Sequence, residues 1–232
     1  MKRVRPDIEL PISFLCTRVK SPTVKVWDKL KRVIQFLYGT IKDNRIIGFN
    51  DLASLLTYVD ASYAVHNNMR SHTGGMMTFG KGIIHGKASK QKLNVKSSTE
   101  AEVVGMSDYL PFSLWMANFL DAQGYKLLNN IVLQDNMSAM KMEKNGRLSC
   151  TGNLRHIDIR FFFTKDRCNK KEISIEHCPT EEMLSDFYTK PQQGSLFHKM
   201  RAVLMGWASL DSLKKIDKTT NIENNVFPVI FN

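Results

Sequence analysis

Cysteine is scarce in this chain: four residues occur among 232, and no two of them form a Cys-x-x-Cys pair. Zinc ribbons are built on such pairs, and small disulfide-stabilised folds use a denser and even set of cysteines. Both classes are therefore excluded. We expect the four thiols to be reduced, as they are inside cells. The fold would then depend on its hydrophobic residues, which make up 43% of the chain.

Long apolar runs are absent as well. A membrane-spanning helix needs about 18 or more consecutive apolar residues, and no stretch of the sequence approaches that length. The charged start, Met-Lys-Arg-Val-Arg-Pro, has no apolar segment behind it of the kind that a signal peptide carries. We therefore expect no membrane partner and an intracellular location. Nothing in the sequence distinguishes a cytoplasmic particle from the nucleus.

Acidic residues are few, and the formal net charge is +11. The first fifty residues hold eleven Lys and Arg against four Asp and Glu, and no acid occurs between Asp60 and Glu100. A basic surplus of this size indicates a polyanionic partner, of which nucleic acid is the commonest. A solvated basic surface without a partner is the alternative, and composition alone does not decide between the two.

Residues 1–50 are predicted to be helical. Ser21-Pro22 is a suitable helix start, apolar residues then recur at helical spacing, and Gly39 is a suitable end. Most of the lysines in this segment lie off the apolar stripe. Such a basic amphipathic helix could lie along a phosphate backbone or could simply be solvated.

From about residue 53 the pattern changes to short β-favouring runs that alternate with helical segments. The predicted strands are 55–59, 76–79, 83–85, 131–134 and 173–176. The predicted helices are 97–124, 137–145, 157–168, 180–189 and 195–206. This order predicts an α/β fold with a mixed sheet flanked by helices. Residues 208–232 are predicted to be a poorly ordered tail, and Phe112, Trp115 and Phe119, at helical spacing, are predicted to lie in the core.

Two of the predicted strands end in an aspartate, Asp60 and Asp135. The carboxyl ends of neighbouring strands meet at one edge of such a sheet, where ligands bind, so these acids suggest a site for a hard cation such as Mg²⁺. The segment Ser-Ser-Thr-Glu-Ala-Glu opens the long helix with Glu100 and Glu102, and Asp186 lies in a later helix. Taken singly, each acid could instead be a helix-capping or turn residue.

Six sequence blocks place these acids in a wider pattern. They are Tyr-Val-Asp-Ala-Ser-Tyr-Ala (58–64), Arg-Ser-His-Thr-Gly-Gly (70–75), Lys-Ser-Ser-Thr-Glu-Ala-Glu (96–102), Gln-Asp-Asn-Met-Ser-Ala (134–139), Arg-His-Ile-Asp-Ile-Arg-Phe-Phe-Phe (155–163) and Pro-Thr-Glu-Glu-Met-Leu-Ser-Asp-Phe-Tyr-Thr-Lys-Pro (179–191). In this order they resemble the ribonuclease H domain of copia-type retrotransposon polyproteins. The resemblance implies a ribonuclease H-like mixed five-stranded sheet, flanked by helices, over residues 53–207. Residues 1–50 resemble the thumb or connection region of the reverse transcriptase, and the Asp-Asp signature of the polymerase palm is absent. Polymerisation by this chain alone is therefore not expected.

The resemblance also implies roles for the acids. The four carboxylates that hold two Mg²⁺ or Mn²⁺ ions in this family are matched by Asp60, Glu102, Asp135 and Asp186. That match leaves Glu100 to cap its helix. His177 lies near the place where related ribonucleases H carry a histidine that assists proton transfer or product release, and a plain surface histidine is the alternative.

Groups that would contact the nucleic acid come mainly from the acid-free region. Basic residues suited to the phosphate backbone are Arg70, Lys87, Lys90 and Lys92. Distinguishing RNA from DNA requires a partner for the 2′-OH, and the candidates for contact with sugar or phosphate are Ser71, Thr73 and Asn136. Arg155 and His156 match a basic pair of the family, with helix capping as the alternative.

The function predicted from these observations is that of a retrotransposon-derived ribonuclease H, which cuts the RNA strand of RNA–DNA hybrids within a reverse transcriptase polyprotein. Its partners would be the hybrid and the polymerase part of that polyprotein. A catalytically silent, nucleic-acid-binding remnant of the same element is the alternative. An integrase-like transferase fits less well, because the acids of such sites end with a helix glutamate, whereas the order here is Asp, Glu, Asp, Asp.

Overall fold

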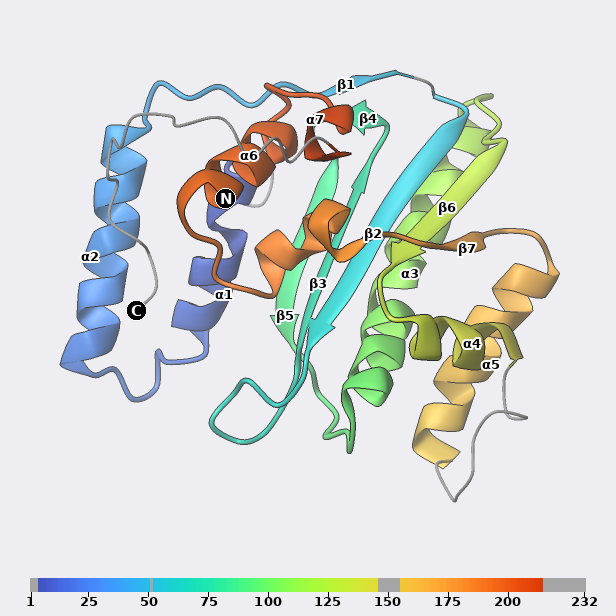
Figure 1. The fold of residues 1–232 in the computed structure, drawn as a ribbon, viewed down its shortest axis with the longest axis horizontal. Coiled ribbons are helices and arrows are strands. Elements are labelled where there is room, and N and C mark those ends of the chain that lie inside the picture. Colours follow the sequence, from blue (N-terminus) through green and yellow to red (C-terminus); the bar gives the residue numbers. More distant parts are fainter. Residues whose placement is uncertain (1–3, 51, 146–154, 215–232) are drawn as a thin grey trace.

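A five-stranded sheet forms the centre of the computed structural model, which describes residues 4–50, 52–145 and 155–214 (Figure 1). The strands are β2 (Ser54–Ser62), β3 (His72–Thr78), β5 (His85–Lys90), β6 (Asn129–Gln134) and β7 (Ser174–His177). Their order across the sheet is β5-β3-β2-β6-β7. The first three form an antiparallel meander, and β6 and β7 run parallel to β2. The predicted α/β class, with a mixed five-stranded sheet flanked by helices, is confirmed.

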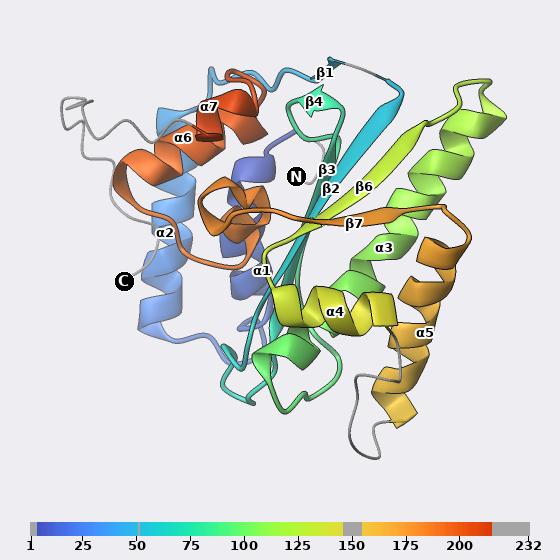
Figure 2. The same ribbon diagram turned by 45° about the vertical axis from the view of Figure 1, so that its right-hand side comes forward.

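Helices cover both faces of this sheet (Figures 1 and 2). One face carries α3 (Ser98–Ala122), α4 (Met137–Asn145) and α5 (Arg155–Asn169). The other carries α1 (Glu9–Cys16), α6 (Gly194–Leu204), α7 (Asp211–Lys214) and three 3-10 helices, η1 (Pro6–Ile8), η3 (Thr180–Glu182) and η4 (Leu184–Tyr188). Within the described residues, no helix is long and apolar enough to cross a membrane.

Side chains of β2 point alternately to the two faces of the sheet, and each face has its own hydrophobic core. Leu55 and Val59 point to the α3 side and pack with Tyr109 and other residues of that helix. Tyr58 points to the opposite side and packs with Leu184 of η4. Because side chains alternate along a strand, the acid two residues beyond Tyr58 lies on the η4 side. Strand β2 also continues beyond that acid to its end at Ser62, so the predicted strand end at residue 59 was too early.

Glycines in β3 allow both layers to approach the sheet closely. A Cβ atom on Gly75 would lie 2.2 Å from Cδ2 of Tyr109 in α3, and one on Gly74 would lie 2.6 Å from a side-chain carbon of Thr189. A residue with a side chain at either position would push its neighbour away. These two glycines therefore set how closely α3 and the segment after η4, both of which contribute to the site below, lie against the strands.

The first fifty residues pack against the rest of the described chain. Helix α2 spans Val24–Gly39 and begins after Thr23, whose side chain accepts a hydrogen bond from the Val26 amide, so the predicted start at Ser21-Pro22 was two residues early. Strand β1 (Gly48–Phe49) pairs with β4 (Gly80–Lys81). The buried carboxylate of Asp7 forms an ion pair with Arg201 of α6 at 2.8 Å. The N-terminal segment is therefore joined to the sheet domain by strand pairing and by a buried ion pair.

The predicted tail begins too early. Residues 208–214 belong to the folded part, because α7 forms there and its Leu213 is only 2% exposed, packed with the core on the η4 side. Residues 215–232, the rest of the predicted tail, lie outside the described residues.

Candidate metal centre

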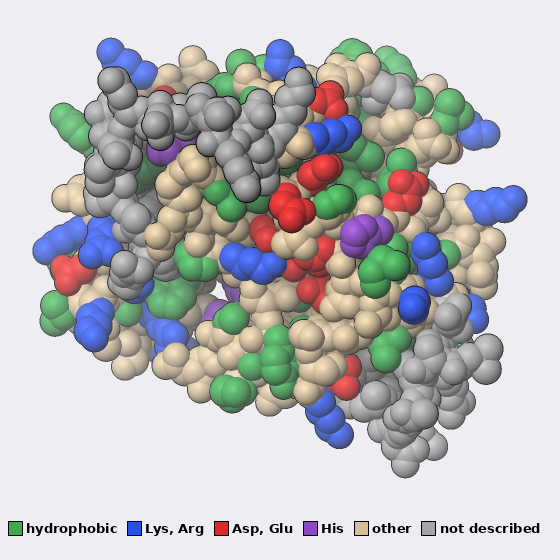
Figure 3. All heavy atoms as spheres, viewed as in Figure 1, with side chains coloured by type: hydrophobic (Ala, Val, Ile, Leu, Met, Phe, Trp, Pro, Cys, Tyr) green, Lys and Arg blue, Asp and Glu red, His purple; other side chains and the backbone are tan. Residues whose placement is uncertain are grey.

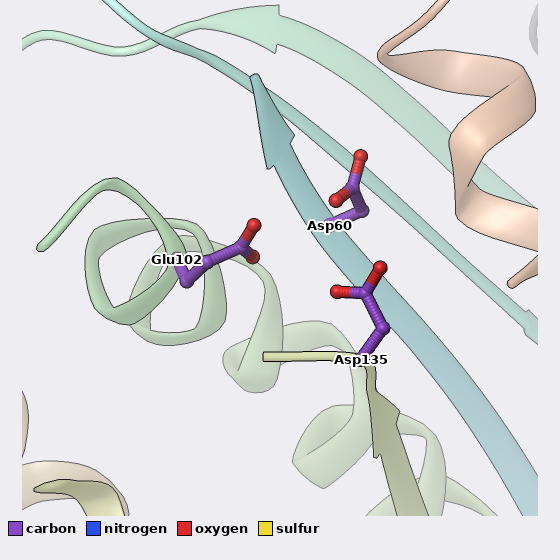
Figure 4. Close-up of side chains that lie close together, drawn as sticks. All are labelled: Asp60, Glu102 and Asp135. Carbon is purple, nitrogen blue, oxygen red and sulfur yellow. The ribbon is translucent and has the colours of Figure 1, made fainter. Parts of the chain in front are cut away.

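Three carboxylates converge at the edge of the sheet where β2 and β6 separate. Oxygen atoms of Asp60, Glu102 and Asp135 all lie within 4.8 Å of one another, and Figure 4 shows the three side chains pointing toward a common point. The last paired residues of the two strands are Tyr58 and Leu133. Each aspartate stands two residues beyond that pair, so both lie at the same height and on the same face. The parallel pairing of β2 with β6 thus brings together two acids that are 75 positions apart.

The start of α3 supplies the third acid, Glu102. It also carries Glu100, whose side chain has a different task. Ser97 accepts a hydrogen bond from the Glu100 amide at 3.2 Å, and the Glu100 carboxylate accepts one from the Lys96 amide at 2.8 Å. Glu100 is therefore a helix-capping residue, as the sequence analysis expected. Glu102, two residues further along, is 4% exposed and accepts a hydrogen bond from the Ala61 amide of β2.

Asp186 lies beside this cluster and is connected to it through a lysine. It sits in η4 and is 5% exposed. The ammonium group of Lys190 lies 2.7 Å from Asp186 Oδ1 and 3.7 Å from Asp60 Oδ2. Hydroxyl groups hold two of the carboxylates: Thr189 donates to Asp60 Oδ2, and Thr180 donates to Asp135 Oδ2 at 3.3 Å.

Lys190 and Thr189 were missed by the sequence analysis, although both lie in the last motif block. The available signal was the spacing in the sequence, because a base four positions after an acid can reach it across one turn of the chain. Figure 3 shows the resulting pattern, with acidic side chains gathered near the middle of this face and a basic side chain beside them.

Burial and crowding shift the proton affinity of these groups. Burial raises the pKa of Glu102 well above its usual range, and the nearby charge of Asp60 raises it further, against the opposing effect of the Ala61 hydrogen bond. Burial also raises the pKa of Asp186 to about 7, with a further contribution from Asp60, while Lys190 lowers it. Without a cation, Glu102 and Asp186 thus tend to keep their protons.

The donor set fits a hard divalent cation. All the groups are carboxylates, and oxygen ligands are what Mg²⁺ and Mn²⁺ take in proteins. Oε2 of Glu102 is buried and has no hydrogen-bond partner among the described residues. A buried carboxylate oxygen without a partner is costly, and a cation bound between the acids would supply that partner.

His177 and Asn136 lie next to the acids. His177 ends β7, is exposed, and pairs in register with Gln134, the residue before Asp135. The side-chain oxygen of Asn136 accepts hydrogen bonds from the amides of Ser138 and Ala139, both at 3.1 Å. Asn136 therefore caps α4, and its side-chain oxygen already accepts hydrogen bonds within the protein.

Two predicted contact residues do not face solvent. Ser71 is fully buried and its hydroxyl accepts a hydrogen bond from the Ala64 amide at 3.2 Å. Thr73 is 4% exposed and its hydroxyl accepts one from Gln91 at 3.0 Å. Both hydroxyls are buried and serve internal hydrogen bonds, which does not agree with the prediction that they touch sugar or phosphate.

The predicted basic contacts of the acid-free region lie on β5 and on the segments next to its end. Lys87 stands over the ring of Phe112 at 4.9 Å, Lys90 is half-buried near the end of β5, and Lys92 is exposed. Arg70 is half-buried in the connection between β2 and β3. Arg155 and His156 open α5, but their side chains lie outside the described part of the chain.

One aromatic prediction was wrong. Trp115 is 60% exposed and Phe119 is 46% exposed, with their rings stacked at 5.3 Å on the outer side of α3. Phe112, in contrast, is partly buried against the core and stacks on His85.

Comparison with known proteins agrees with the motif blocks. No protein-family model matches the chain. It is 28% identical over 187 residues to the retrovirus-related Pol polyprotein from transposon TNT 1-94 of Nicotiana tabacum, and 28% identical over 189 residues to that from transposon RE2 of Arabidopsis thaliana. These matches cover 80% and 81% of this chain, which spans 14% and 13% of the two polyproteins. Among solved structures, LC11-RNase H1, isolated from compost, matches 56% of this chain and 87% of its own, with 12% identity and a TM-score of 0.41.

The chain is thus homologous to part of the Pol polyproteins of copia-type plant transposons. The resemblance inferred from the motif blocks is confirmed.

Proposed function

We propose that this chain carries the ribonuclease H activity of a retrotransposon Pol polyprotein and hydrolyses the RNA strand of RNA–DNA hybrids with the help of two divalent ions. The observation that carries the proposal is the convergence of Asp60, Glu102 and Asp135 within 4.8 Å. The homology to Pol polyproteins supports it, because such an element has to remove RNA from hybrids during reverse transcription.

The ions would be held by the three converging acids together with Asp186, which lies beside them. Bound there, they would make the attacking water easier to deprotonate and would neutralise the charge that develops on the phosphate. In the reaction, an oxygen of water forms a bond to phosphorus while the bond to the 3′-oxygen breaks. The products are a 5′-phosphate and a 3′-hydroxyl.

The residues around the acids have supporting tasks. Thr189 and Thr180 orient Asp60 and Asp135 through their hydroxyl groups. Lys190 supplies positive charge between Asp60 and Asp186, and this charge would be displaced when cations bind. His177 would take up or deliver a proton at the reacting phosphate, and its exposed position next to the last β6 residue supports this role. Lysines of the acid-free segment would bind the backbone of the hybrid.

The test compares two glutamates on the same turn of α3. Purified chain is incubated with end-labelled RNA–DNA hybrid and Mg²⁺, and the cut RNA is measured. Glu102→Gln is expected to lower the rate by more than about 100-fold, since even the outer partners of metal ligands contribute about 10- to 100-fold. Glu100→Gln, the matched control, removes a capping group outside the cluster and should cut at nearly the wild-type rate.

Two results would count against the proposal. If Glu102→Gln still cuts like the wild type, the carboxylates are not the catalytic centre. If the wild type binds hybrid but does not cut it, even when fused to the polymerase part of a related polyprotein, the chain is the silent nucleic-acid-binding remnant.

A further inference from the structure

Two buried polar side chains meet on the α4 side of the sheet, directly behind one acid of the metal centre. Gln134 is the last residue of β6, and Glu143 lies in α4. Val132 packs into the core on the α3 side, and Leu133 packs against the core on the opposite side. Because side chains alternate along a strand, Gln134 points to the face that α4 covers, whereas Asp135 points to the η4 side.

The polar atoms of these two side chains have no partner of good geometry. Gln134 and Glu143 are both fully buried, and neither Nε2 and Oε1 of Gln134 nor the two carboxyl oxygens of Glu143 form such a hydrogen bond with a described residue. Buried polar groups in proteins are almost always paired, because leaving one unpaired costs free energy. Met140 and Cys168, which belong to the apolar core on this side, do not offer such pairing.

The two side chains are close enough to satisfy each other. Burial raises the pKa of Glu143 to about 8, and a side-chain interaction with Gln134 opposes this effect, so the two groups lie within reach. The other titratable groups that act here are Lys144, exposed on α4, and Cys168 of α5, whose own pKa is raised by burial and by Glu143. At neutral pH Glu143 is therefore mainly the uncharged acid, with one O–H donor and one carbonyl acceptor.

An uncharged acid and an amide are complementary. The acid O–H can donate to Oε1 of Gln134, and Nε2–H of Gln134 can donate to the carbonyl oxygen of the acid. The terminal torsions of both groups rotate over a broad range at little cost, so this pair of hydrogen bonds satisfies all the unpartnered atoms together. An ionised carboxylate only accepts, and it would leave Oε1 of Gln134 unpaired.

The pair lies where β6 loses a neighbour. Pairing with β2 ends two residues before Asp135. Beyond that point β6 is held by β7, where the Cys178 amide donates to the Gln134 carbonyl at 2.9 Å. Asn136, directly after the acid, caps α4 through its side chain. A Gln134 side chain held by Glu143 would fix the residue directly before the acid to the same helix, so that α4 holds the backbone on both sides of Asp135.

We propose that Glu143 is a positioning residue, which holds the Gln134 amide through two complementary hydrogen bonds and thereby fixes Asp135 for cation binding. The role in cation binding rests on the proposed function, whereas the pair itself does not. Glu143 touches no reacting group, and it acts on the metal centre only through Gln134 and the end of β6.

Two measurements at about pH 6.5 test the proposal, because at that pH an acid and an amide at position 143 are both uncharged. Mg²⁺ titration followed by NMR gives the affinity of the metal centre. Hydrogen exchange of the Cys178 amide in EDTA gives the local stability of the β6 end without metal. Glu143→Met is expected to weaken Mg²⁺ affinity by about tenfold or more, which is what outer partners of metal ligands contribute. Exchange should become about fivefold faster or more, as the loss of a hydrogen bond predicts.

The conservative variant separates hydrogen bonding from simple packing. Glu143→Gln can form an amide–amide pair with the same two hydrogen bonds and should stay within about twofold of the wild type in both measurements. Gln134→Met should behave like Glu143→Met. The double variant Gln134→Met/Glu143→Met should be no worse than either single variant, because effects within one interacting pair do not add. Gln123→Met, which removes an exposed amide at the end of α3, is the control and should change neither quantity.

Thermal melting shows which variants fold, and if Glu143→Met does not, the double variant carries the test, because both partners are then apolar. Wild-type Mg²⁺ affinity and exchange in the folded Met variants would show that the pair does not position Asp135. A loss in Glu143→Gln as large as in Glu143→Met would show that the paired hydrogen bonds are not the cause, and the proposal would again be wrong. If the wild type does not bind Mg²⁺, the proposed function fails at its metal centre, and the exchange data still decide whether Glu143 holds the end of β6.

Discussion

The buried carboxyl group of Glu143 in α4 allows a direct test of how burial in this fold changes the pKa of an acid. Its side chain is fully buried, and neither carboxyl oxygen accepts a hydrogen bond of good geometry from a described residue. Burial raises the pKa of Glu143 to about 8, and the polar neighbour Gln134 offsets only part of that effect. At neutral pH the folded protein therefore holds Glu143 mainly as the uncharged acid.

The size of the effect follows from the difference between the folded and unfolded states. An unfolded glutamate has a pKa of 4.5. Between that value and about 8 the folded state binds more protons, so stability falls as pH rises. At about 1.4 kcal/mol for each pKa unit, the free energy of unfolding contributed by this group falls by about 2 to 3 kcal/mol between pH 5 and pH 7.

Glu143→Gln removes this dependence, because glutamine is uncharged at every pH. The free energy of unfolding of the variant, relative to that of the wild type, is expected to rise by about 2 to 3 kcal/mol between pH 5 and pH 7. This corresponds to about 5 to 10 °C in melting temperature for a chain of this size. Urea unfolding in EDTA at several pH values measures this difference. Glu176→Gln, an exposed carboxyl on β7, is the control and should show no such gain. A stability difference between Glu143→Gln and wild type that does not change with pH would refute the reasoning.

Two more predictions concern packing and the metal centre. Gly75→Ala should destabilise the fold by about 1 to 3 kcal/mol in urea unfolding, because its Cβ would lie 2.2 Å from Tyr109; unchanged stability would show that α3 can move away at no cost. Lys190→Met should raise the pKa of Asp186 above its present value of about 7, since the ammonium group lowers it. Because Lys190 is partly exposed, the free energy of unfolding of the metal-free variant should fall by only about 1 kcal/mol at pH 8. Added Mn²⁺ should restore the melting temperature of the variant. A variant that Mn²⁺ does not stabilise would contradict the assigned site.

Most of the secondary structure could be predicted from the sequence. The long helix and the parallel strands were found within a few residues, because apolar periodicity and β-favouring runs are local properties of the chain. The ends of strands were predicted less well where pairing with another strand sets them. Strand β2 continues to Ser62 because β3 pairs with it that far. The segment predicted as one helix over 180–189 forms two short 3-10 helices instead.

Side-chain environment could not be predicted in the same way. Helical spacing shows that Phe112, Trp115 and Phe119 are neighbours along α3, but spacing does not show which part of the helix surface faces the sheet. Ser71 and Thr73 looked available for nucleic acid, yet both side chains are buried and hydrogen-bonded within the fold.

The sequence by itself determined the chemistry available to this protein: its acids, its basic surplus, the order of its strands and helices, and the homology that the motif blocks carry. Only the tertiary structure decided which of these groups meet. Asp60 and Asp135 approach because β2 and β6 pair in parallel and stop pairing two residues before them, and such register depends on contacts between distant segments, which no local pattern encodes.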